Sequence, residues 1–118
     1  MRWQYYQTKY EESIQKLKSA KDRLKIITPE IHSLRDIIQR LKRRIASLKH
    51  QLSMATTPEG IAEAKSKIEL AESELREKEA QLNTLLSEER ELKETIKAET
   101  AKLNRLLREF ISEYRRSL

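Results

Sequence analysis

The stretch Ser53-Met54-Ala55-Thr56-Thr57-Pro58-Glu59-Gly60 interrupts a sequence that otherwise contains almost no helix-breaking residues. It holds one of the two prolines and the only glycine of the 118 residues. Thr57 suits the N-cap of a helix, Pro58 suits the first helical position, and Glu59 suits the positive end of the helix dipole. The stretch therefore predicts that one helix ends and another begins within a few residues.

This turn divides the chain into two long segments. We predict a helix over about 2–55, a turn at about 56–57 and a second helix over about 58–117. A connection this short makes two helices antiparallel neighbours. The predicted fold class is all-α: a single domain over 1–118 that forms a long antiparallel two-helix coiled-coil hairpin.

The residues before the turn follow a seven-residue repeat. In each heptad, two positions form a stripe, and fifteen of the sixteen stripe positions are apolar or aromatic. Such spacing keeps one stripe facing a partner helix in a left-handed supercoil. Only Ser13 departs from it. The positions are Trp3, Tyr6, Tyr10, Ser13, Leu17, Ala20, Leu24, Ile27, Ile31, Leu34, Ile38, Leu41, Ile45, Leu48, Leu52 and Ala55.

The residues after the turn carry a weaker stripe. Four of its sixteen positions are charged, namely Lys78, Glu89, Glu99 and Glu113. We expect the first three to lie along a thin seam and to place their charged ends in water. Alternatively, they fix the register or mark where a partner inserts.

Small and large residues match across the two stripes when Tyr6 is set opposite Phe110. The same register sets Ile45 opposite Ala71. The stripe also keeps its phase through Pro29, from Ile27 to Ile31, whereas a loop would normally shift it. We therefore predict one first helix kinked near Pro29, the alternative being two helices that meet at a corner there.

Composition and motifs argue against catalysis and against metal or cofactor binding. The chain has no cysteine, which excludes disulfides and thiolate metal sites. His32 and His50 occupy outward heptad positions, and no glycine-rich phosphate loop is present. We expect no enzyme activity, no metal, no cofactor and no small-molecule substrate. No apolar run is long enough to cross a membrane, and Met1-Arg2-Trp3-Gln4-Tyr5 lacks the apolar core of a signal peptide, so we expect a cytoplasmic protein.

The first half of the chain is basic. Residues 2–55 carry 13 basic and 5 acidic side chains, whereas residues 58–118 carry 12 basic and 14 acidic ones. The densest group is a possible contact for polyanions, either nucleic acid or an anionic membrane. It consists of Arg40, Lys42, Arg43, Arg44 and Lys49. The competing interpretation is a solvated face, in which Glu72 and Glu74 of the second helix hold Lys42 and Arg44.

The hairpin would gather all six aromatic residues at its open end, together with a second apolar stripe beside the main one. One seam needs only one stripe, so the extra residues cap the end of the rod or form a surface for a second chain. The predicted self-association patch is Trp3, Tyr6, Tyr10, Ile14, Leu107, Phe110, Ile111, Tyr114 and Leu118.

We therefore expect a homodimer with a local four-helix bundle at the open ends, without excluding another protein partner. The function predicted from the sequence is a non-enzymatic structural or interaction protein, a rigid self-associating scaffold or adaptor. The alternative is a polyanion-binding module that uses the basic face of the first helix.

Overall fold

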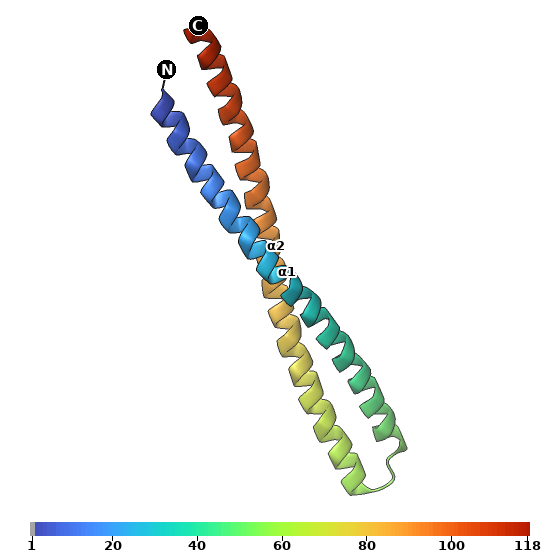
Figure 1. Ribbon diagram of the computed structural model, residues 1–118. Helices are drawn as coiled ribbons and strands as arrows, with labels where there is room; N and C mark the ends of the chain where they lie inside the picture. Colours follow the sequence, from blue (N-terminus) through green and yellow to red (C-terminus); the bar gives the residue numbers. More distant parts are fainter. Residues whose placement is uncertain (1) are drawn as a thin grey trace. The chain divides into compact units, whose positions relative to one another are not determined.

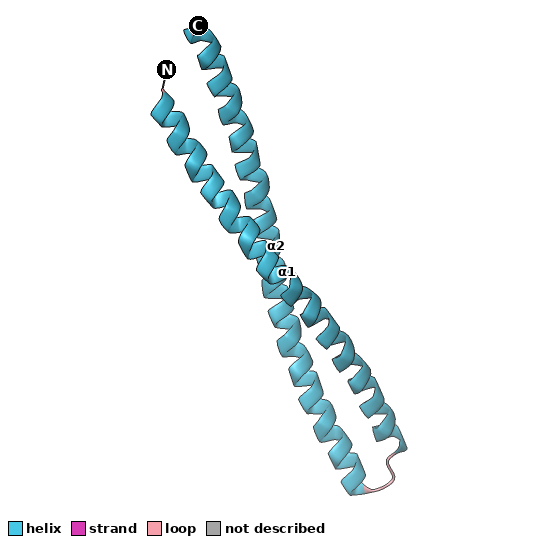
Figure 2. Ribbon diagram, viewed as in Figure 1, coloured by secondary structure: helices cyan, strands magenta, loops and turns pink. Residues whose placement is uncertain are grey.

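A computed structural model describes residues 2–118, which form two α-helices and one short connection (Figure 1). Helix α1 spans Trp3–Met54 and helix α2 spans Pro58–Ser117. The described residues fall in these helices or in the connection and ends beside them, as Figure 2 shows. The predicted all-helical class with two long helices is confirmed. Neither helix has a stretch long and apolar enough to cross a membrane over the described residues.

Helix α1 ends at Met54, one residue before the predicted end. The backbone N–H of Ala55 bonds the carbonyl of Leu52 at 3.2 Å, and this tighter turn leads the chain out of the helix. The connection comprises residues 55–57. Its short length leaves no room for any other structure between the helices.

Thr57 caps α2 as its sequence position predicts. Its hydroxyl accepts a hydrogen bond from the backbone N–H of Gly60 at 3.0 Å, satisfying one of the free donors of the first turn. A Cβ atom at Gly60 would lie 2.9 Å from that hydroxyl oxygen. The only glycine of the chain therefore allows the cap to close tightly. Pro58 and Glu59 occupy the first turn, as predicted.

Pro29 lies inside α1, which continues through it as one helix. Proline lacks the N–H that would bond the carbonyl four residues earlier. One residue before it, the Thr28 hydroxyl donates to the carbonyl of Leu24 at 2.7 Å. The prediction of a single first helix is confirmed, and the alternative of two separate helices is wrong.

The helices pack as two compact units, which are described separately. Unit 1 combines the part of α1 up to Thr28 with Ser87–Leu118, and unit 2 is Pro29–Leu86. The boundary within α1 falls directly before the helical proline.

Unit 2 has an entirely apolar interior. Ile45 and Leu48 of α1 form a buried cluster with Ile68 and Ala71 of α2, against which Leu52 and Leu75 also pack. The cluster agrees with the predicted register, in which Ile45 meets Ala71. The buried side chains of this unit are Ile31, Leu34, Ile38, Leu41, Ile45, Leu48, Ala64, Ile68 and Ala71.

Unit 1 has a mixed interior. Tyr6, Ala20 and Ile27 are its buried apolar residues, and Ser13 and Glu99 are buried beside them. The Tyr6 and Phe110 rings meet edge to face with centroids 5.5 Å apart, which confirms that predicted contact. Unit 1 therefore buries polar side chains in its interior, whereas the buried residues of unit 2 are all apolar.

Candidate functional site

The strongest candidate site is an exposed apolar surface on unit 1. Seven of the nine predicted patch residues are exposed there, including Trp3 at 60% and Leu107 at 56% of their full accessible surface. Heptad counting places them at or beside one edge of the seam between α1 and α2. This surface, named the apolar flank, consists of Trp3, Tyr10, Ile14, Leu107, Ile111, Tyr114 and Leu118.

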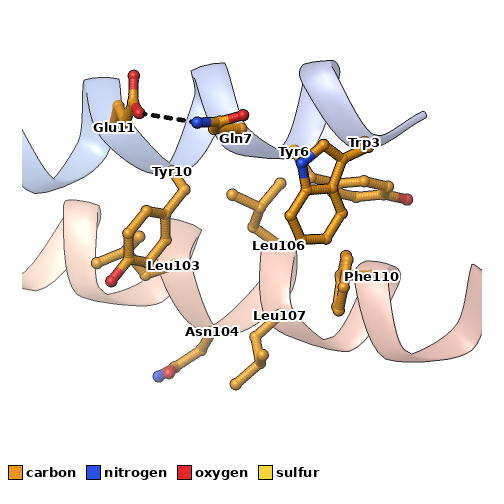
Figure 3. A pocket seen from close by; sticks show the side chains of 10 residues that line it. All are labelled: Trp3, Tyr6, Gln7, Tyr10, Glu11, Leu103, Asn104, Leu106, Leu107 and Phe110. Carbon is orange, nitrogen blue, oxygen red and sulfur yellow. Dashed lines mark hydrogen bonds between the residues drawn. The ribbon is translucent and has the colours of Figure 1, made fainter. Parts of the chain in front are cut away.

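A groove of about 500 Å³ opens along the apolar flank. Figure 3 shows the Trp3 side chain reaching from α1 toward Phe110 of α2, and the Tyr10 side chain reaching toward Leu103. Two polar residues of α1 lie along it, and the side-chain amide of Gln7 donates to the Glu11 carboxylate at 3.4 Å. The groove is lined by Trp3, Tyr6, Gln7, Tyr10, Glu11, Leu103, Asn104, Leu106, Leu107 and Phe110.

Aromatic contacts join the two helices at this end of unit 1. The Trp3 ring lies 5.6 Å from Phe110, and Phe110 stacks on Tyr114 at 6.3 Å. The Arg2 guanidinium lies 4.6 Å from the centre of the Tyr5 ring, a cation–π distance. Aromatic rings at such spacings stabilise a structure by more than the burial of their apolar surface alone. Ring contacts thus join five of the six aromatic residues, and the sixth, Tyr10, lines the groove beside them.

Two members of the predicted patch do not belong to its surface. Tyr6 is only 5% exposed, because its ring packs inside the unit against Phe110, which is itself half-buried. The Tyr6 hydroxyl donates to the Glu113 carboxylate. That hydrogen bond, together with burial, raises the pKa of Tyr6. Tyr6 therefore lies in the interior of unit 1, where it packs against Phe110, and is not part of the exposed surface.

Glu113 joins the last turns of α2 to the beginning of α1. Besides the Tyr6 hydroxyl, it accepts the backbone N–H of Arg2 at 3.0 Å, and the Arg2 guanidinium lies 3.6 Å away. These donors lower the pKa of the Glu113 carboxyl, with the Tyr6 hydroxyl contributing most. The first turn of α1 has no acidic residue of its own. Glu113 therefore places a negative charge at the positive end of the α1 dipole from the other helix.

The other edge of the unit 1 seam is charged. Lys9, Lys16, Lys102 and Glu109 line a separate groove there. Farther along α1, Arg23 donates twice to Glu88, at 2.6 and 3.1 Å. This ion pair lowers the pKa of the Glu88 carboxyl. One edge of unit 1 is thus apolar and the other is ionic.

Glu99 corrects the sequence prediction for charged seam residues. Its carboxylate does not reach into water, because the side chain is buried and accepts the Ser13 hydroxyl at 2.8 Å. Lys102 lies 3.4 Å from it. The Ser13 hydrogen bond is the main cause of the lowered pKa of the Glu99 carboxyl, and Lys102 adds to it. Glu89, in contrast, is half-buried and pairs with Lys93 at 3.8 Å.

The five basic residues that the sequence proposes as a polyanion contact all lie exposed in unit 2. Glu72 does not hold Lys42, because it pairs instead with Lys49 at 3.7 Å. Among the described residues, Arg44 has no carboxylate partner, so the prediction that Glu74 holds it is also wrong. This surface, named the basic band, consists of Arg40, Lys42, Arg43, Arg44 and Lys49. His32 and His50 are exposed, as their heptad positions predict.

Sequence reasoning missed two cross-helix hydrogen bonds between seam residues, Tyr6 with Glu113 and Ser13 with Glu99. A signal for each was present. Ser13 is the only polar residue of the first stripe, and Glu99 and Glu113 are charged members of the second. Polar residues at seam positions of both helices, close in register, indicate pairing across the seam, since buried polar groups are usually hydrogen-bonded.

Comparison of the chain with protein-family models, with curated proteins and with solved structures gives no match. The functional interpretation therefore depends on the two surfaces and on the packing beneath them.

Proposed function

We propose that the chain is a non-enzymatic interaction module: an antiparallel coiled-coil hairpin that self-associates through the apolar flank of unit 1. In the dimer, two copies of the flank form a local four-helix bundle. Such a module acts as a scaffold or adaptor that holds two attached partners at a defined spacing. The observation that carries the proposal is the concentration of exposed apolar side chains on one edge of unit 1.

The apolar flank is large enough for a dimer. Its seven side chains expose on the order of 700 Å², given that an aromatic side chain presents about 150–250 Å². A specific interface buries about 800 Å² on each partner. Two flanks packed together therefore reach the lower range of stable interfaces. Each fully buried large apolar side chain contributes roughly 1.5–3 kcal/mol, before the cost of association is subtracted.

The charged residues beside the apolar flank favour a second copy of this chain as its binding partner. Glu11 lies at the α1 edge of the groove, and Arg108 and Arg115 follow the apolar residues of α2. None of the three forms an ion pair among the described residues. One carboxylate on one side of the flank and arginines on the other can attract each other when two copies meet about a two-fold axis.

Self-association is tested by measuring molecular mass in solution. The double variant Ile111→Glu, Tyr114→Lys places two charges in the flank without changing the net charge. The matched control is Met54→Glu, Leu70→Lys, which makes the same changes at two exposed apolar positions of unit 2. Sedimentation equilibrium should show a wild-type dimer at about 100 µM, a monomeric flank variant and a dimeric control.

Two results contradict the proposal. A wild-type chain that is monomeric at about 100 µM would mean that the flank binds a different protein or only caps the unit. Equal mass loss in both variants would place the interface outside the flank. Circular dichroism must show that both variants keep their helix content, so that loss of mass is not loss of folding.

The hairpin itself is tested by a disulfide. Leu48 and Ile68 belong to one buried cluster, and the chain has no cysteine of its own. The variant Leu48→Cys, Ile68→Cys should form a bond within one chain under mild oxidation at high dilution. Disulfide-linked dimers as the sole product would show that the helices pair between chains.

A further inference from the structure

The basic band of unit 2 is open to a second kind of partner. Its members Arg40, Lys42, Arg43 and Arg44 have exposed side chains and no carboxylate partner among the described residues. Only Lys49 is paired, through a long contact of 3.7 Å with Glu72 in which the lysine stays 61% exposed. Exposed pairs of this kind are weak and are replaced easily by another anion. The band therefore offers five cations to a partner.

The band surrounds the outward half of α1. With 3.6 residues per turn, Arg43 points directly away from the seam, Arg40 and Arg44 lie to one side, and Lys42 lies to the other. From residue 40 to residue 49 the helix rises about 14 Å. A DNA duplex carries about one negative charge per 1.7 Å of its axis, so the band meets phosphates over its full length. Its three arginines can each bind a phosphate through two N–H groups.

This arrangement favours a nucleic-acid duplex over a membrane surface. A helix that lies on a membrane needs an apolar face beside its basic one. The exposed large apolar residues of unit 2 are only Met54 and Leu70 among those described, and neither lies within 35–50. Charges that surround a rod, in contrast, can contact phosphates on both sides of a groove.

The recognition would be directed at phosphates and not at bases. All six tryptophan, tyrosine and phenylalanine residues lie within 3–10 or 110–114, so unit 2 has none of these rings for bases to stack on. Single-strand binding proteins use such stacking platforms. We infer that the basic band binds the phosphate backbone of a double-stranded nucleic acid without sequence preference. This inference does not depend on self-association, because it uses residues outside the apolar flank.

The experiment measures binding of a fluorescent mixed-sequence DNA duplex, about two helical turns long, by anisotropy at two salt concentrations of about 50 and 200 mM. The band variant is Arg40→Gln, Arg43→Gln, Arg44→Gln. The matched control is Lys9→Gln, Lys16→Gln, Lys18→Gln, which removes three charges from unit 1. Each lowers the formal net charge from +6 by three.

The band variant should bind at least about tenfold more weakly at the lower salt, and its logarithmic salt slope should fall by about 3, close to one for each lost contact. The control should lose less than about threefold. The charge-preserving variant Arg40→Lys, Arg43→Lys, Arg44→Lys should keep the wild-type salt slope. Circular dichroism verifies that all variants remain helical.

Three outcomes would overturn the inference. Equal losses in the band variant and in the control would show attraction by net charge alone. Wild-type binding that does not weaken with salt would exclude phosphate contacts. Binding to vesicles of equal parts phosphatidylserine and phosphatidylcholine, with none to the duplex, would assign the band to a membrane surface.

Discussion

Unit 1 and unit 2 have the same two-helix construction but bury different kinds of side chains. The interior of unit 2 holds nine buried residues, all apolar, and only Met54 and Leu70 are large exposed apolar residues there. Unit 1 buries two polar residues, Ser13 and Glu99, and exposes nine large apolar or aromatic residues among those described. Unit 2 has thus placed its apolar material inside, whereas unit 1 has placed much of it on one edge.

The difference shows that one heptad pattern can have two purposes within the same chain. In unit 2 the apolar stripes of α1 and α2 bury each other, next to the turn that Thr57 caps. In unit 1 hydrogen bonds to Glu99 and Glu113 join the helices, while apolar residues beside the seam remain uncovered. Exposed apolar surface on this scale supports the proposal that unit 1 binds a second copy.

The largest effect should come from truncating the interior of unit 2. Leu48→Ala removes a side chain that is 6% exposed, and it should lower the free energy of unfolding by about 2–5 kcal/mol. Leu107→Ala on the apolar flank should change the stability of the monomer by less than about 0.5 kcal/mol. Urea denaturation of both variants at low protein concentration measures the difference. Equal costs would mean that the two units bury their leucines alike.

A smaller change of opposite sign should follow from Pro29→Ala at the boundary between the units. Alanine restores the N–H that the helix lacks, so the free energy of unfolding should rise by up to about 3 kcal/mol. Thermal melts followed by circular dichroism provide the measurement. A lower melting temperature would show that the proline is required at this position of α1.

The smallest effect concerns the buried Glu99 carboxylate of unit 1. The Ser13 hydroxyl lowers its pKa in the folded chain, so the unfolded chain binds more protons near the ordinary glutamate pKa of about 4.3. The Glu99 carboxylate therefore contributes its full stabilisation above this ordinary pKa, and the contribution is lost as the pH falls through the lowered pKa of the folded chain. The melting temperature should fall between about pH 5 and pH 3, and Glu99→Gln should reduce this fall. An identical fall in both proteins would remove Glu99 from the explanation.

Periodicity and cap residues predicted much of the fold. The stripe through Pro29 indicated one helix, and Thr57-Pro58-Glu59 indicated where α2 begins. Both signals are local and act through backbone geometry, which explains their reliability. The apolar flank was also predictable, since residues such as Leu107 and Ile111 fall off the seam at helical spacing.

The polar contacts were harder to predict because they join residues far apart in the sequence. Whether Glu99 meets Ser13 or water depends on side-chain geometry within the seam, which spacing alone does not define. Lys49 pairs with Glu72 in place of Lys42 because long exposed side chains choose among neighbours with little difference in energy. Tyr6 fits both the seam stripe and the predicted patch by its apolar ring, and spacing does not reveal that its hydroxyl donates to Glu113 of the other helix.

The most direct test uses Trp3, the only tryptophan of the chain, which lies in the groove of the apolar flank. Acrylamide quenching of its fluorescence reports how much of the ring water can reach. If two flanks cover each other, quenching should be weak at about 100 µM and should increase on dilution to about 1 µM. The Ile111→Glu, Tyr114→Lys variant should be strongly quenched at both concentrations. Wild-type quenching that stays constant and strong over this range would contradict the claim that a second copy covers the apolar flank.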